Sequence, residues 1–301
     1  MKSKTYLYLG ILAVLLIAAY FLTSDRGEKT ASYKLTEKKL FEIDSGKVDK
    51  IEIKNKGENL LLSKASGDWR IEQPFQYRTV SSNVEALVSG LKNLKLESIV
   101  STNPAKKDTY GFNDMDQAEV TVYESGVQKG KFLLGKTASG SASYIKKMDS
   151  DNIYLGEGID RNIFIKPNVN DWKDKNIVSI PKQSINSVQV ISEGETYTAI
   201  RDSSGKYFID QDSAGKNFDI ILNTLQKFDA SGFRDTLISD QSDFTATVIV
   251  DNGNKSEFRF LKLDTTPVKY LLKVSGDLQV YKLDEVNAKN VFKTKKEITG
   301  K

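Results

Sequence analysis

The residues most suggestive of chemistry form a phosphate-loop pattern in the middle of the chain. Gly130-Lys-Phe-Leu-Leu-Gly135-Lys136-Thr137 matches G-x-x-x-x-G-K-S/T at every position. Such a loop binds phosphates because its backbone amides surround them between a strand and a following helix. Here the apolar residues inside the motif are typical of a strand, and the small residues after Thr137 are poor residues for starting a helix. We therefore interpret the match as a coincidence.

Two shorter motifs are also incomplete. Asp210-Gln-Asp212-Ser-Ala-Gly215 opens like a calcium loop, but Ala214 and Ile221 stand where that loop needs oxygen ligands. Gly156-Glu-Gly158 lacks the third glycine of a dinucleotide-binding fingerprint. We interpret the first as a turn before a helix and predict no cofactor at either place.

Histidine and cysteine are absent, which removes the commonest zinc ligands and the usual groups for proton transfer near neutral pH. Asp149, Asp151 and Asp160 form a loose acidic group, which we interpret as a solvated hairpin rim. Forty acidic residues allow many carboxylate pairs, and no pair stands out. We therefore predict no catalytic residues, no metal site and no cofactor.

Three aromatic residues remain as candidates for a binding surface. Trp69 and Tyr207 each follow a Gly-x turn, and this shared position favours core packing over sugar stacking. Trp172 follows the end of the first of two similar segments. We expect Trp172 to be exposed or at an interface.

Length and composition limit the class of protein. The chain has 301 residues, of which 39% are hydrophobic and 28% charged, so it is neither disordered nor a multi-span membrane protein. The net charge is +4, and no run of lysines interleaved with aromatics occurs. Nucleic acid is therefore not an expected partner.

The amino terminus carries an apolar segment. Lys2 and Lys4 precede twenty uncharged residues, 5–24, and Tyr6 to Leu22 is almost wholly apolar. Twenty helical residues span a bilayer, and positive charge before the span favours a cytoplasmic amino terminus. We predict a single-pass protein of the bacterial inner membrane that contacts lipid through residues 5–24, with its bulk periplasmic or otherwise extracytoplasmic. A cleaved signal peptide is the alternative.

The remainder of the chain repeats one pattern twice. Val48–Ile53 and Ile185–Val190 both alternate apolar and polar residues, and each is followed by further strands and then by one amphipathic helix. We expect an α+β fold of two tandem antiparallel β-rich units with one principal helix each, preceded by one transmembrane helix. The predicted boundaries are 1–24 for the cytoplasmic stub and anchor, 25–39 for a linker, 40–180 for the first unit and 181–301 for the second.

The order of several short motifs resembles the bacterial domain-of-unknown-function 4340 family. The matching residues are Gly67-Asp-Trp69-Arg-Ile71-Glu-Gln-Pro74, Tyr110-Gly-Phe112, Leu134-Gly135 and Tyr144. The resemblance implies an amino-terminal membrane segment and repeated β-rich units. It also implies a role beside ABC-type transporter components, including those likened to gliding-motility transport proteins. The family offers no catalytic residues to transfer.

These observations predict a non-catalytic, membrane-anchored extracytoplasmic interaction protein. Its expected role is that of an accessory component of an ABC-type transport assembly, in contact with permease or ATPase subunits. A binding module for cell-envelope polymer is the alternative, and it requires an exposed aromatic strip or cleft near Trp172. A carboxylate-dependent extracytoplasmic hydrolase comes third, and it requires a buried, closely spaced carboxylate pair.

Overall fold

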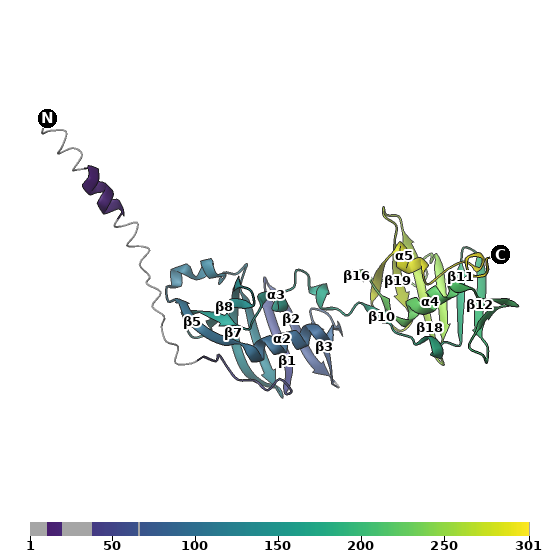
Figure 1. Ribbon diagram of the computed structural model, residues 1–301, viewed down its shortest axis with the longest axis horizontal. Coiled ribbons are helices and arrows are strands. Elements are labelled where there is room, and N and C mark those ends of the chain that lie inside the picture. Colours follow the sequence, from purple (N-terminus) through teal and green to yellow (C-terminus); the bar gives the residue numbers. More distant parts are fainter. Residues whose placement is uncertain (1–10, 20–37, 66, 301) are drawn as a thin grey trace. The chain divides into compact units, whose positions relative to one another are not determined.

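The structure is a computed structural model that describes residues 11–19, 38–65 and 67–300. The chain divides into two compact units, Met1–Lys173 and Asp174–Lys301 (Figure 1). Each unit contains one large sheet with a helix of three turns or more lying across it.

The first unit is built on a nine-stranded antiparallel sheet. Its strands are β1 (Val48–Asn55), β2 (Glu58–Ala65), β3 (Asp68–Gln73), β4 (Tyr77–Arg78), β5 (Lys95–Ser101), β6 (Ala118–Glu124), β7 (Val127–Ser139), β8 (Ala142–Lys147) and β9 (Ile153–Glu157). They pair in the order β4-β3-β2-β1-β6-β7-β8-β9-β5. Its helices are α2 (Ser81–Asn93), α3 (Arg161–Phe164) and the 3-10 turns η1 (Pro104–Tyr110) and η2 (Val169–Trp172).

The second unit has an equivalent sheet. Its strands are β11 (Ser187–Ser192), β12 (Glu195–Arg201), β13 (Tyr207–Ile209), β14 (Asp212–Ser213), β16 (Gly232–Arg234), β17 (Ala246–Asp251), β18 (Lys255–Leu263), β19 (Lys269–Val274) and β20 (Val280–Asp284). Their order is β14-β13-β12-β11-β17-β18-β19-β20-β16. A separate pair joins β10 (Asn176–Val178) to β15 (Phe228–Asp229). The helices are η3 (Lys182–Ser184), α4 (Lys216–Gln226), α5 (Glu285–Lys289) and α6 (Lys295–Thr299).

The two sheets have the same topology. In each, the first strand after the long helix that joins the large sheet lies at its far edge, β5 in one unit and β16 in the other. Four consecutive strands before the helix and four after it fill the remaining places in the same order. Such agreement of order and position indicates that one structural unit occurs twice in the chain.

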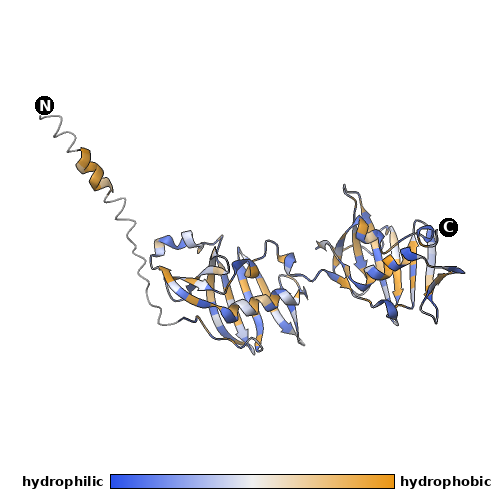
Figure 2. Cartoon of the chain, viewed as in Figure 1, coloured by the Kyte–Doolittle hydropathy of each residue, from blue (hydrophilic) through white to orange (hydrophobic). Residues whose placement is uncertain are grey.

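Hydrophobic periodicity explains why these segments form these elements. In β1, Ile51 and Ile53 are buried, while Glu52 between them faces outward. In α2, the buried side chains of Val84, Leu87 and Leu91 recur at steps of three and four residues. The alternation is visible along the strands of both units (Figure 2). Burying one such aliphatic side chain contributes about 1.5–3 kcal/mol, so the helix and the sheet stabilise each other.

The last turn of each unit packs against the start of its helix. The backbone amide of Val80, the N-cap of α2, donates to the carbonyl of Trp172 at 3.3 Å. In the second unit the amide of Gly215, the N-cap of α4, donates to the carbonyl of Ile298 at 3.3 Å. We call η2 and α6 the closing segments, because each connects the end of its unit to the start of that unit's long helix, α2 or α4.

Trp172 therefore lies inside the first unit, which corrects the expectation that it is exposed or at an interface. Its side chain is only 2% exposed and belongs to the core cluster that includes the sheet residues Ile53 and Leu60. Ile298, at the same place in the second unit, is 3% exposed. The indole fills the end of the core because the closing segment turns it inward.

Backbone hydrogen bonds also hold the residues that precede the first strand of each unit. The amide of Leu96 donates to the carbonyl of Lys38 at 2.7 Å, and the amide of Ala230 donates to the carbonyl of Lys175 at 2.8 Å. The sequence placed residues 174–180 in the first unit. In the structure, β10 pairs with β15 of the second unit, and the amide of Ile180 donates to the carbonyl of Leu225. The second unit accordingly begins next to Lys173.

The predicted fold class needs correction. The described residues are mostly antiparallel β-structure in two large sheets, and their helices are few and short apart from α2 and α4. An α+β class preceded by a transmembrane helix is contradicted by this architecture. The two segments with helical periodicity do form α2 and α4, but sheet strands outnumber helices in both units.

The predicted membrane span is contradicted as well. Among the described residues, no helix has the length and apolar character needed to cross a bilayer. Residues 11–19 are helical and hydrophobic throughout (Figure 2). The localisation to the inner membrane as a single-pass protein, which rested on that span, is withdrawn. Tyr6, Leu22 and the remainder of the expected segment 5–24, like the predicted linker up to residue 37, lie outside the described residues.

Removing the closing side chain of a unit will destabilise it. We predict that Trp172→Ala lowers the free energy of unfolding of the first unit by about 3–5 kcal/mol, because it leaves a cavity in the core. Ile298→Ala will cost the second unit about 2–5 kcal/mol. Urea denaturation of the full chain measures both, with Val286→Ala as a control at a position that is 68% exposed. Equal stability of the Trp172 variant and the control would contradict the assignment.

Candidate functional site

The phosphate-loop pattern lies inside a strand, as its apolar residues predicted. Gly130 to Thr137 all belong to β7, so no loop and no following helix are formed there. A Cβ at Gly130 would lie 2.5 Å from the ring of Phe41, and one at Gly135 would clash with the carbonyl oxygen of Tyr110. These glycines permit close packing, and the motif is not a nucleotide site.

The other acidic motifs have structural roles. Asp210, in the calcium-like turn, pairs with the Lys295 Nζ at 2.7 Å. Asp160 caps α3 by accepting from the Asn162 amide at 2.9 Å, and Asp151 pairs with Lys146. Within the described part of the chain, no group of three or more acidic side chains could hold a metal ion. These side chains are therefore engaged in turns and surface pairs.

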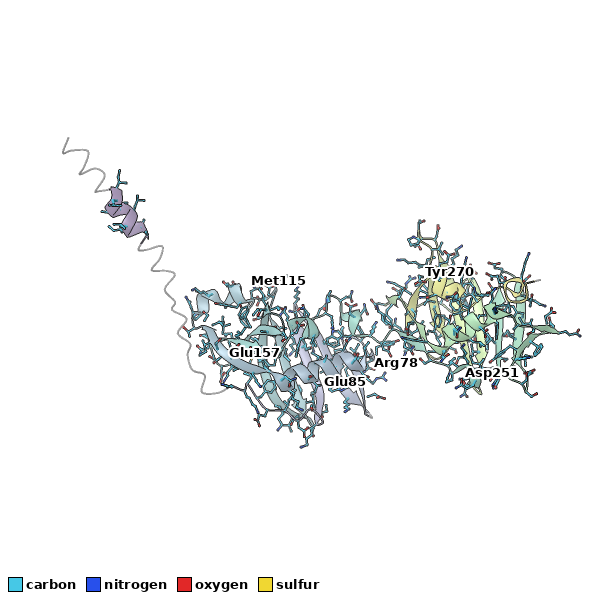
Figure 3. The ribbon with its side chains drawn as sticks, viewed as in Figure 1. Arg78, Glu85, Met115, Glu157, Asp251 and Tyr270 are labelled. Atoms are coloured by element: carbon cyan, nitrogen blue, oxygen red, sulfur yellow. The ribbon has the colours of Figure 1, made fainter. Side chains whose placement is uncertain are left out.

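One close carboxylate pair lies at the edge of the first sheet. Glu97 on β5 and Glu157 on β9 are both exposed, and Figure 3 labels Glu157. The Glu157 carboxyl raises the pKa of Glu97, through a shared hydrogen bond and through like charge. A hydrolase requires such a pair in a cleft that excludes water, and this pair is solvent-exposed. The Glu97–Glu157 pair therefore lacks the burial that the hydrolase hypothesis requires.

Trp69 borders an open groove in the first unit. The groove lies between one side of α2 and the β2–β3 hairpin, and its volume is about 500 Å³. Trp69 is half-buried against the core and leaves part of its indole facing this space. Its lining also includes Ser45, Lys64, Gly67, Asp68, Ser81, Glu85, Val88, Ser89 and Lys92. We call this the Trp69 groove, and Figure 3 labels Glu85 on its helical wall.

The equivalent aromatic in the second unit is used differently. Tyr207 is 9% exposed and its ring packs 4.9 Å from that of Phe218, measured between centroids. Its hydroxyl donates to the carbonyl of Ile185 at 2.7 Å. Burial raises the pKa of Tyr207, which keeps the hydroxyl protonated as a donor. The prediction of a core aromatic is confirmed for Tyr207, whereas Trp69 is only partly covered.

The second unit carries a different unusual surface on the outer side of its sheet. The outward positions of β11, β12 and β17 carry one charge, on Asp251, which lies opposite Ser187 at the end of β17. The other eight hold no charge, and we call them the uncharged face: Ser187, Gln189, Ile191, Thr196, Thr198, Ile200, Thr247 and Ile249. Ile191 is 40% and Ile200 is 59% exposed. Arg201, Asp202 and Asp210 border it beside a shallow depression of about 470 Å³.

The same surface of the first unit is charged. The outward residues of β1 that correspond to Ser187, Gln189 and Ile191 are Lys50, Glu52 and Lys54. Lys54 pairs with Glu52 and with Glu119 on β6, and the Lys50 ammonium lies 3.8 Å from the ring centroid of Tyr123. This difference in charge between the two outer faces could have been found by aligning the two copies position by position. A search for motifs within one copy does not detect it.

A family model described as a domain of unknown function (DUF4340) matches residues 69–246. This match covers more than half of the chain. The protein belongs to the DUF4340 family. The matched range begins in β3 and ends at the first residue of β17, so it includes parts of both units. Neither the curated proteins nor the solved structures contain a match.

The glycines of β7 supply a stability test in this DUF4340 chain. We predict that Gly135→Ala lowers the free energy of unfolding by about 1–3 kcal/mol, because the new methyl group overlaps Tyr110 and Phe112. Gly46→Ala is the control, since its Cβ meets only the Asp44 side chain at 3.4 Å. Thermal or urea denaturation measures the difference. A Gly135 variant as stable as the control would show that the close packing is absent.

The Glu97–Glu157 pair predicts a pH effect. Since the folded-state pKa of Glu97 is raised above its usual 4.5, its contribution to stability is present below that value and is lost as the pH rises through the raised pKa. Glu97→Gln will therefore flatten the fall in unfolding free energy above pH 4.5, measured by urea denaturation at several pH values. Glu58→Gln, on an exposed position of β2, is the control. An NMR titration that places the Glu97 pKa at or below 4.5 would contradict the pairing.

Proposed function

We propose that this DUF4340 protein is a non-catalytic interaction protein, an accessory component of an ABC-type transport assembly. We further propose that the uncharged face of the second unit is the surface that contacts a partner subunit. The observation that carries this proposal is the difference between the two copies: one outer sheet face is charged and internally paired, and its counterpart is not.

The composition of the uncharged face supports a protein partner. The centres of protein interfaces are depleted of charged residues and surrounded by a polar rim. Here Ile191 and Ile200 stand among threonine, serine and glutamine side chains, with Arg201 and Asp202 at the margin. Threonine and isoleucine on a rigid sheet also lose little side-chain entropy on binding, because β-branched residues have few rotamers.

The face has a clear limit within its own unit. Toward β18 and β19 the outer surface becomes charged again, since Arg259 pairs with Glu257 at 2.5 Å and Lys273 pairs with Asp240 at 2.7 Å. Ile238 packs nearby with Leu271 and Val280 and covers part of that region. The uncharged residues therefore form one bounded surface, as expected of a docking site for a single subunit.

A non-catalytic role agrees with the chemistry that the chain contains. The whole sequence has neither histidine nor cysteine. The close carboxylate pair, Glu97 and Glu157, is exposed at a sheet edge, where water screens both groups. The choice of permease or ATPase subunits as partners rests on the family resemblance alone, and the experiment below is designed to test it.

A double variant tests the docking surface. Ser187→Lys with Ile191→Lys gives the second unit the lysines that the first unit carries at Lys50 and Lys54. We predict that capture of ABC permease and ATPase subunits by the tagged full-length chain falls at least about tenfold, because two charges would be buried in the interface. Quantitative mass spectrometry of the captured proteins measures the change.

Lys50→Ser, the reciprocal substitution on the first unit, is the matched control and should leave capture unchanged. If the double-lysine variant recovers the same subunits in the same amounts, the uncharged face is not the docking surface. If the wild-type chain recovers no permease or ATPase subunit, the accessory role itself is contradicted. The two results therefore distinguish the surface from the partner.

A further inference from the structure

The Trp69 groove is open in the first unit, whereas an aromatic side chain packs into the core at the corresponding place of the second. In the second unit, Tyr207 occupies the corresponding place, packs on Phe218 and donates its hydroxyl hydrogen to the carbonyl of Ile185. In the first unit the indole of Trp69 stays half-buried, and space of about 500 Å³ remains beside it. That volume lies within the range of small-molecule sites, which is roughly 300–1,000 Å³.

The walls of the groove offer hydrogen-bonding groups that the protein does not use itself. Among the residues that the structure describes, the side chains of Lys64, Asp68 and Glu85 form no hydrogen bond or ion pair. Glu85 and Lys92 lie on the same exposed side of α2, seven residues apart, and so line the groove along two turns of helix. Asp68 and Lys64 face them from the hairpin.

The balance of charge favours an uncharged ligand. Two lysines, Lys64 and Lys92, are matched by two carboxylates, Asp68 and Glu85, so the lining has no net charge. A strongly anionic or cationic ligand would meet as much repulsion as attraction there. A neutral ligand that carries many hydroxyl groups can instead donate to the carboxylates and accept from the ammonium groups.

The partly exposed indole of Trp69 indicates that the ligand also has a flat apolar surface. An aromatic ring binds a flat apolar surface, and a pyranose ring presents such a surface through its C–H groups while its hydroxyls point outward. We propose that the Trp69 groove binds a neutral saccharide, with one pyranose ring stacked on Trp69 and its hydroxyls bonded to Asp68 and Glu85. This site is independent of the docking surface, because it lies in the other unit and uses different residues.

Tryptophan fluorescence gives a direct test, because the sequence contains only Trp69 and Trp172 and the second is 2% exposed. The full chain is titrated separately with cellohexaose, maltohexaose and chitohexaose up to about 10 mM, a range that covers weak single-site binding. We expect at least one hexasaccharide to shift the emission and to reduce its quenching by acrylamide. Calorimetric titration of the same samples measures binding without relying on either tryptophan.

Substitutions locate the binding. Trp69→Ala and Glu85→Ala should each weaken the affinity for the binding saccharide at least about tenfold, as loss of a stacking or charged hydrogen-bonding contact does. Ser82→Ala, an exposed residue of α2 that does not line the groove, is the matched control. Circular dichroism and urea denaturation of each variant show whether it is folded, so that weaker binding is not mistaken for unfolding.

Two results would overturn the proposal. The first is the absence of any binding by the three hexasaccharides in both fluorescence and calorimetry. The second is binding that Trp69→Ala and Glu85→Ala leave unchanged, which would place the saccharide elsewhere. The double variant Ser187→Lys with Ile191→Lys should not affect saccharide binding. The saccharide proposal and the partner proposal can therefore be contradicted independently.

Discussion

Each unit depends on a hydrogen bond between its last turn and the start of its helix. A buried helix begins with amide groups that have no partner within the helix, and each must find one elsewhere. The carbonyl of Trp172 accepts from Val80, and that of Ile298 accepts from Gly215. Trp172 also accepts from the Thr79 hydroxyl at 2.7 Å. The unit is therefore complete only when its final residues are folded back on the helix.

This constraint explains why the copies can differ elsewhere. The helix, the sheet order and the closing segment are held by the core, where a change of volume is costly. Outward positions of β1 and β11, by contrast, lie outside the core, and they are Lys50 and Lys54 in one copy and Ser187 and Ile191 in the other. Differences of this kind are where two copies of a scaffold acquire separate binding surfaces.

The sequence predicted those parts of the fold that depend on local pattern. The alternation at Val48–Ile53 predicted β1, and the spacing from Val84 to Leu91 predicted α2. The N-cap of that helix is Val80, which makes no side-chain cap. Its amide is satisfied by the distant Trp172, and such a long-range partner leaves no signal in local spacing.

Other features could not be predicted because they depend on tertiary context. Trp172 appeared to follow the end of the first copy, yet the closing segment brings it into the core. Trp69 and Tyr207 occupy one position in the repeat, but only Tyr207 has a hydroxyl that reaches backbone carbonyls and closes its site. The apolar segment near the amino terminus predicted a membrane span from composition alone, and no helix among the described residues has the length and apolar character that a span requires.

Truncation across the closing segment tests this account most directly. Residues 38–173 and residues 38–167, made separately, differ only in whether Trp172 and its turn are present. Two-dimensional amide NMR should give a dispersed spectrum for 38–173, with peaks that coincide with those of the full chain, and a collapsed spectrum for 38–167. Equally dispersed spectra for both fragments would contradict the claim that the closing segment completes the unit.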